Sequence, residues 1–154
     1  MRSARAAYSL GAAGLAEGTN ANTFKTSNIL HFVINGRAYV KAATDNIAFS
    51  AETALTSAFV AQAAKKVCVY FFFINSAGTI TVSQGTQYDA TTETGYVARA
   101  IDWPQVADKA CIGALKIQTN NSATFTPASV DLGATDVVDT FYDVADDYGV
   151  PVTI

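Results

Sequence analysis

The chain has 154 residues, half of them hydrophobic and 15% charged, with a formal net charge of -3. A chain of this length forms one domain that buries roughly 68–70% of its unfolded surface. Its ten Lys and Arg residues are scattered, which argues against a nucleic-acid-binding protein, and no run approaches the roughly 20 apolar residues of a membrane span. A free monomer would have few charges to keep it in solution. We therefore predict that apolar surface is shared with other chains, by oligomerisation or assembly.

The first segment, residues 1–22, is rich in Ala and Gly. It buries too little to offset its backbone entropy, so we expect an extended N-terminal arm followed by one domain over residues 23–154. Either a neighbouring subunit holds this arm, or the arm packs along its own domain.

The strongest local signal is a hairpin over residues 28–41. Its centre is Asn35-Gly36, a dipeptide that supplies the two positive φ angles of a type I′ turn. Residues 44–48 could continue this sheet. The Ala-rich segment 50–64 fits either a short helix or an irregular crossover.

A second group of strands follows. Residues 66–75 are apolar on both faces, as in a strand that is covered on both sides. A turn at 75–78 and the alternating segment 79–83 predict a second hairpin. Residues 110–119 predict a further strand, with a final hairpin partner beginning at 123–125. The fold class is therefore all-β, an antiparallel β-sandwich or a jelly-roll-like barrel.

The two ends of the chain differ in charge. Arg2 and Arg5 precede the first acid, Glu17, whereas the chain from residue 129 onward carries six Asp and no Lys or Arg. We interpret the latter as an acidic, partly aromatic tail and expect arm and tail to attract each other between subunits. The residues predicted to contact a partner are Arg2, Arg5, Tyr8, Leu10 and Leu15 in the arm, and Asp139, Phe141, Tyr142 and Asp143 in the tail.

The sequence offers little for catalysis or metal binding. His31 is the single histidine and lies within an apolar strand, which favours a structural role over a nucleophile triad. The acids Asp143, Asp146 and Asp147 lack the glycine-centred calcium loop, which favours a solvated acidic surface. We therefore expect no enzyme activity and no cofactor or metal.

The two cysteines, Cys68 and Cys111, each lie inside a strand-like run, with no CxxC pair or metal-ligand spacing. Buried thiols are the favoured interpretation. A disulfide stays open as an alternative if the two strands are neighbours.

Several sequence segments in the second half of the chain resemble those of a known class of proteins. The order of residues 77–85, a Pro-containing linker, residues 109–117, residues 123–127 and residues 139–142 is similar to small virion proteins of tailed bacteriophages, commonly head decoration (cement) proteins. The resemblance implies a β-rich, often jelly-roll-like homotrimer that clamps neighbouring major capsid subunits. It also implies assembly in the host cytoplasm and a final position on the capsid surface.

A second function class is compatible with the same composition. A receptor- or carbohydrate-binding β-domain of a phage tail or fibre would display aromatic side chains on its loops, and Tyr88, Tyr96 and Trp103 are candidates. Trp103 fits a core or interface position better.

Overall fold

The computed structural model describes residues 7–90, 103–144 and 151–153, and the described residues form strands and no helix. The expected all-β class is confirmed. The strands are β1 (Ala7–Ser9), β2 (Leu15–Glu17), β3 (Thr23–Thr26), β4 (Leu30–Ile34), β5 (Arg37–Lys41), β6 (Thr44–Ala48), β7 (Lys66–Asn75), β8 (Ile80–Gln84), β9 (Tyr88–Asp89), β10 (Lys109–Thr119), β11 (Val137–Val144) and β12 (Pro151–Thr153).

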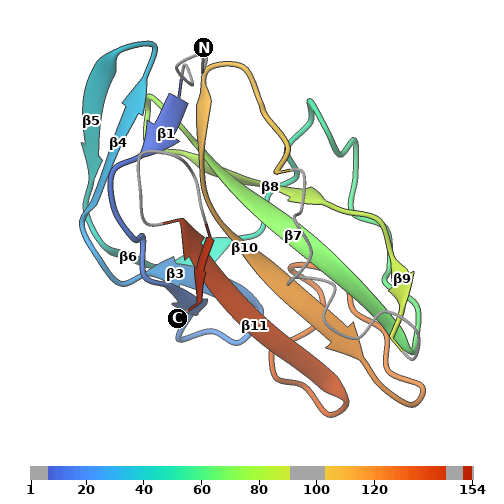
Figure 1. The fold of residues 1–154 in the computed structure, drawn as a ribbon. Helices are drawn as coiled ribbons and strands as arrows, with labels where there is room; N and C mark the ends of the chain where they lie inside the picture. The colour runs from blue at the N-terminus through green and yellow to red at the C-terminus, as the bar shows by residue number, and fades with distance from the viewer. Residues whose placement is uncertain (1–6, 91–102, 145–150, 154) are drawn as a thin grey trace.

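The strands pair antiparallel in three sheets (Figure 1). The largest has the order β12-β11-β10-β7-β8, with β9 paired to the start of β7. The two smaller sheets have the orders β1-β4-β5 and β2-β3-β6. Among the described strands no sheet closes on itself, so the structure does not contain the barrel that the sequence left open.

The predicted β4–β5 hairpin is confirmed. Asn35 and Gly36 have φ angles of 50° and 77°, and the register pairs Ile34 with Arg37 across a two-residue turn. Both positive φ angles are those of a type I′ turn, whose twist matches the flanking strands. Local sequence alone therefore fixes this hairpin.

The central strand β7 is buried on both faces, as predicted. Residues such as Tyr70 and Phe72 point into the main core. The alternate residues Phe71 and Phe73 form a second cluster with Val69 and Ala114, against which Trp103 and Val106 pack. Because side chains alternate along a strand, each face of β7 needs its own cover.

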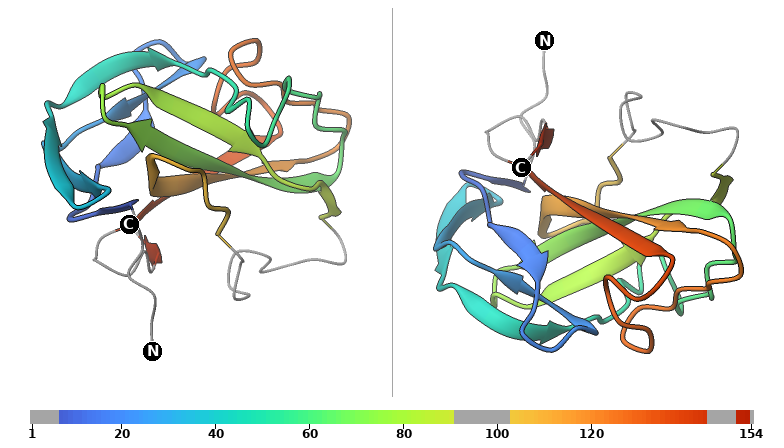
Figure 2. Two further views of the ribbon diagram at one scale, coloured as in Figure 1. Left: turned by 90° about the horizontal axis from the view of Figure 1, so that it is seen from above. Right: turned by 90° about the horizontal axis from the view of Figure 1, so that it is seen from below.

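The main core lies between the large sheet and the β2-β3-β6 sheet, which face each other in the two views of Figure 2. The ring of Phe24 on β3 meets the ring of Phe72 on β7 edge to face at 4.8 Å and the ring of Phe49 at 5.1 Å. Such tilted pairs add to the apolar burial that holds the layers together.

The segment between β6 and β7 is the irregular crossover and contains no helix. Gln62, which is fully buried, exchanges backbone hydrogen bonds with Phe125 and donates from Nε2 to the carbonyls of Lys66 and Ile117. These bonds replace the internal ones of a helix. β6 is indeed a strand, but it pairs with β3 and does not continue the β4–β5 hairpin.

The hairpin partner that we predicted for β10, beginning at residues 123–125, is wrong. Residues 123–125 make a single isolated bridge, between Phe125 and Gln62. The hairpin partner is β11, whose residues pair with β10 from Val137 to Asp143. The expected acidic tail is therefore, over residues 137–144, a strand of the largest sheet.

The N-terminal segment also differs from the expected arm. Residues 7–9 pair with β4, and residues 15–17 pair with β3. Ala13 and Leu15 belong to the main core, with exposed fractions of 0% and 2%. Of the two possibilities that the sequence left open, the described part of this segment packs along its own domain.

Candidate interaction surface

The β1-β4-β5 sheet has an apolar side chain on most positions of both faces. Its inner face presents Phe32, Ile34 and Tyr39 to the core. Side chains alternate along strands, so the outer face is formed by the intervening residues. We call this set the outer face, and it consists of Tyr8, Leu10, His31, Val33, Ala38 and Val40.

The register aligns the outer face in two rows across the sheet. Tyr8 pairs with Val33, which pairs with Ala38. In the next row the amide of Leu10 donates to the carbonyl of His31 at 2.8 Å, and His31 pairs with Val40. Three strands thus bring these residues together.

The outer face is well exposed at its margin. Val40 is 64% exposed and Leu10 is 44% exposed, and Ile29, which precedes β4, is 62% exposed. Val33 is nearly buried within the face, at 9%. Exposed apolar side chains that share one face of a sheet are typical of a surface that meets another macromolecule.

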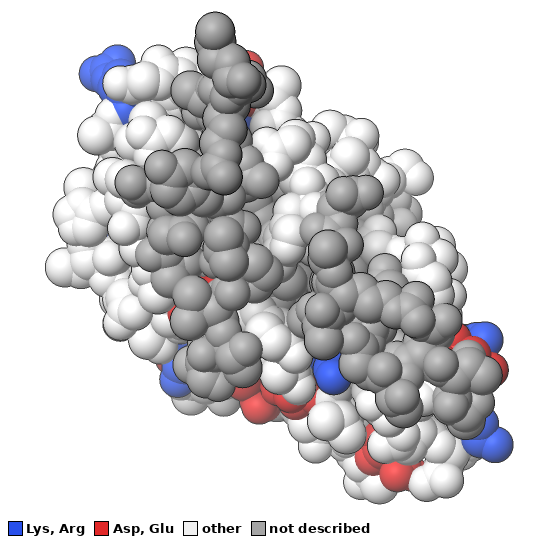
Figure 3. All heavy atoms as spheres, viewed as in Figure 1, with Lys and Arg blue, Asp and Glu red and all other residues white. Residues whose placement is uncertain are grey.

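Positive charge borders this surface. Arg37 and Lys41 lie at the two ends of β5, and the Arg37 guanidinium lies 5.8 Å from the centroid of the Tyr39 ring. Among the described residues neither cation has an ion-pair partner. In Figure 3 much of the visible surface is uncharged, and one group of basic atoms projects at the upper left, near the β4–β5 turn.

The predicted arm residues fall in three different places. Arg2 and Arg5 lie outside the described residues. Tyr8 and Leu10 lie on the outer face, where a partner can reach them. Leu15 is 2% exposed in the core, so the expectation that it contacts a partner is corrected: its side chain holds β2 onto the domain's own layers.

The predicted tail residues are mostly used inside the chain. The Phe141 ring packs against the core, 6.4 Å from the Phe72 ring. Tyr142 is half-buried, and burial raises the pKa of its hydroxyl. Asp139 remains partly exposed near Glu17, whose pKa is raised by burial and by the charges of Asp139 and Asp131.

Asp143 has the clearest internal role. Its carboxylate is 4% exposed and accepts the backbone N–H groups of Gly14 at 3.0 Å and Leu15 at 3.1 Å. Burial raises the pKa of Asp143, and the two N–H bonds oppose that rise. The solvated position expected for Asp143 is therefore wrong. N-terminal segment and predicted tail do meet, but here within one chain and through backbone amides.

A second buried carboxylate lies beside β8, the strand at the opposite edge of the largest sheet from β11 and β12. Glu52 is 2% exposed and accepts from the Lys109 ammonium, the Thr81 hydroxyl at 2.5 Å and the amide of Ala54 at 3.2 Å. Burial alone would raise the pKa of Glu52, but these bonds hold it below its usual value. The carboxylate of Glu52 is hydrogen-bonded to protein groups through both oxygens and paired with Lys109. This arrangement fits a structural ion pair better than a catalytic acid or base.

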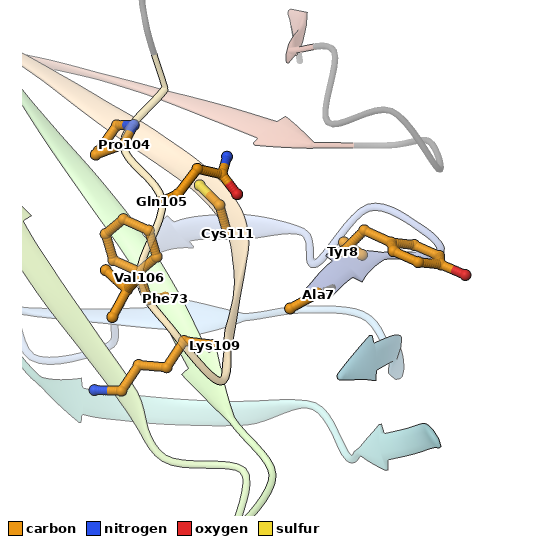
Figure 4. Close-up of a pocket in the computed structure, with 9 residues that line it drawn as sticks. Ala7, Tyr8, Phe73, Pro104, Gln105, Val106, Lys109 and Cys111 are labelled. Atoms are coloured by element: carbon orange, nitrogen blue, oxygen red, sulfur yellow. The ribbon is translucent and has the colours of Figure 1, made fainter. Parts of the chain in front are cut away.

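Lys109 also borders a small pocket between β1, β10 and residues 104–106 (Figure 4). The Lys109 amine points away from the Cys111 sulfur, and the Tyr8 ring points away from both. The open space is about 10 Å³, room for about one water molecule. This pocket is too small for an organic ligand.

The two cysteines and the single histidine also lie in the described part of the chain. Cys68 and Cys111 are both thiols. Cys68 is buried as expected, which raises its pKa to about 12, whereas Cys111 is only half-buried, so the expected burial is wrong for that residue. His31 is exposed on β4. The described residues place no three His, Cys, Asp or Glu side chains where they could share a metal ion.

Comparison of the chain with protein-family models, curated proteins and solved structures finds no match. Within the described residues, no helix has the length and apolar character needed to cross a membrane. Leu10, Ile29 and Val40 are three of the six exposed large hydrophobic residues in the described part of the chain, and they lie on or beside one sheet. The outer face is therefore the candidate functional surface. The sequence analysis found Tyr8 and Leu10 but missed Val40 and Ile29, although the alternation of β5 places Val40 and Ala38 on one side.

Proposed function

We propose that the chain is a structural virion protein that decorates the outside of a tailed-bacteriophage capsid and binds the major capsid subunits through the outer face. The observation that carries the proposal is the exposure of Leu10 and Val40 on a sheet whose other face already packs on the core. The resemblance of the sequence to decoration proteins supplies the class of partner.

The fold supports a rigid attachment. The largest sheet and the β2-β3-β6 sheet face each other across a shared aromatic core, which supports a two-layer β-sandwich. The outer face belongs to a third sheet at the side of these layers. A stiff body that presents a preformed apolar face loses little conformational entropy when it binds.

The proposed mechanism is the addition of buried area at joints between shell subunits. Each apolar side chain that becomes fully buried contributes about 1.5–3 kcal/mol, so a few such residues give only a weak single contact. A homotrimer, which we also propose, multiplies weak contacts by effective concentration. Native mass spectrometry of the purified protein tests this point, with three times the chain mass expected and a monomer contradicting it.

A point substitution tests the outer face better than truncation of the N-terminal segment does. Removing residues 1–20 would delete β1 and β2 together with the core side chain of Leu15, so loss of binding after truncation would only report unfolding. A point substitution on the outer face is cleaner. Leu10→Glu places a charge on the proposed contact at a position that is already 44% exposed.

Leu55 supplies a matched control, since it is 46% exposed in the crossover segment. The assay is co-sedimentation with shells assembled from the major capsid protein of the same virus. Leu10→Glu should weaken binding at least about tenfold, because a buried unpaired charge costs more than 1.4 kcal/mol, and Leu55→Glu should bind normally. Equal binding by both variants and the unmodified chain would refute the proposed contact.

The alternative, a carbohydrate- or receptor-binding domain, has less support. The Trp103 ring packs edge to face on Phe71 at a centroid distance of 5.2 Å, and Tyr88 is half-buried on β9. Tyr96 lies outside the described residues. The two described aromatic residues are thus partly occupied in packing, whereas a glycan platform needs exposed ring faces.

A further inference from the structure

We propose that the edge of β5 receives an extended strand of the partner protein, one that carries two acidic residues four positions apart with apolar residues between them. This inference rests on the proposed function, because it names the chemistry of the segment that the outer face would meet. It is carried by the backbone geometry of β5 and by the charges at its two ends.

The outward backbone groups of β5 follow from the hairpin register. β5 is the last strand of its sheet. In a two-residue hairpin the residues that flank the turn, here Ile34 and Arg37, exchange both backbone hydrogen bonds. By alternation Tyr39 and Lys41 also face β4, so the N–H and C=O groups of Ala38 and Val40 point away from the sheet. These groups can pair with an added strand.

A second copy of the same strand is a poor occupant. In the antiparallel register that pairs all five residues of β5 with another β5, Arg37 stands opposite Lys41 twice. Like charges directly opposite each other destabilise a strand pair. The two cations therefore act against self-association at this edge, which is a common protection of edge strands.

The same two cations favour an acidic strand. Arg37 is held over the Tyr39 ring, and neither Arg37 nor Lys41 has a carboxylate partner among the described residues. Partner residues opposite them lie on their side of the sheet, so carboxylates there can form two cross-strand ion pairs. Residues opposite Ala38 and Val40 extend the outer face and should be apolar. The expected pattern is acid, apolar, any residue, apolar, acid.

Two synthetic peptides test this pattern without any capsid. The probe is acetyl-TEVTVET-amide, and the control is acetyl-TKVTVKT-amide, which differs only in charge. By nuclear magnetic resonance, the acidic peptide should shift the amide signals of Ala38 and Val40, slow their hydrogen exchange and bind at least about tenfold more tightly than the basic one. Equal or undetectable binding of the two peptides would overturn the inference.

Charge reversal provides the matched variants. Arg37→Glu combined with Lys41→Glu should invert the peptide preference, because both cations become acids. Neither change alters the turn residues Asn35 and Gly36. Lys65→Glu, an exposed position immediately before β7 and far from β5 in Figure 1, should keep the preference of the unmodified chain. The inference fails if the double variant still prefers the acidic peptide.

Shell binding separates this inference from the proposed function. Val40→Pro removes an outward N–H that β4 does not use, and Pro is tolerated at such edge positions. Val40→Ala keeps the N–H and removes apolar surface. If Leu10→Glu abolishes shell binding while Val40→Pro binds as well as Val40→Ala, the decoration function stands and strand addition is wrong. If the unmodified chain binds no shell but binds the acidic peptide selectively, the decoration function is wrong and the edge site stands.

Discussion

Replacing Asp143 with alanine should destabilise the fold by about 2 kcal/mol. The carboxylate accepts two backbone N–H groups, from Gly14 and Leu15. Leu15 is 2% exposed, so its N–H would lose its partner where water does not reach, at about 1–3 kcal/mol. Gly14 is half-buried, so its N–H regains part of its bonding from water. Removing a buried carboxylate also recovers desolvation energy, which offsets part of the loss.

Equilibrium unfolding in urea measures this change, with the midpoint and slope fitted together. Asp139→Ala on the same strand is the control. Asp139 raises the pKa of Glu17 by repulsion, so its removal should be neutral or slightly stabilising. Asp143→Asn should lie between the two, because one amide oxygen replaces two carboxylate oxygens as acceptors. If Asp143→Ala falls within about 0.5 kcal/mol of Asp139→Ala, the claim that this carboxylate anchors the N-terminal segment is refuted.

Four further results are expected. Lys109→Met should destabilise the fold by about 2–4 kcal/mol, because it leaves Glu52 buried without its cation, and adding Glu52→Gln should restore part of the loss; unfolding of both variants measures this, and no recovery would contradict it. Cys68 should react with Ellman's reagent at pH 8 only after unfolding, because its pKa is raised to about 12; labelling of this thiol in the native protein would contradict the burial. The stability that Glu52 contributes should be present above its ordinary pKa of 4.5 and lost as the pH falls through its lowered folded pKa, so the advantage of the unmodified chain over Glu52→Gln should shrink below about pH 4.5, and an advantage that grows there would refute this sign. For Asp143, whose folded pKa is raised, the advantage over Asp143→Asn should instead widen as the pH falls toward 3.8, and a shrinking advantage would refute the raised pKa.

The parts of the fold that the sequence predicted are those with a strong local signal. Asn35-Gly36 fixes the β4–β5 hairpin through its own φ angles. β7 is recognisable because ten residues in succession suit a strand that is buried on both faces. In both cases the information lies in neighbouring residues, so no knowledge of distant contacts is needed.

The parts that the sequence missed depend on contacts between distant residues. β11 carries six Val, Thr, Phe or Tyr residues in eight, which favours a strand, but Asp139 and Asp143 made it resemble a solvated tail. The buried carboxylate of Asp143 has hydrogen-bond partners only because the amides of Gly14 and Leu15, almost 130 positions away, reach its oxygens. A single sequence gives no sign of such a pairing.

The outer face was likewise predictable from the sequence only in part. The sequence points to Tyr8, which is half-buried, and to Leu10, which is exposed, through their apolar character in a segment that buries little. Their place beside His31 and Val40 follows from the pairing of β1 with β4, because Ala7–Ser9 carries too little signal to predict a strand. The tertiary pairing, and not the local sequence, creates the outer face.

Electron cryomicroscopy of purified virus particles that carry the chain is the most direct test of the account. We predict density for this fold on the outside of the shell, with the side chains of Leu10 and Val40 covered by another polypeptide. A map that shows the chain absent from the shell, or bound with these two side chains open to solvent, would contradict the account.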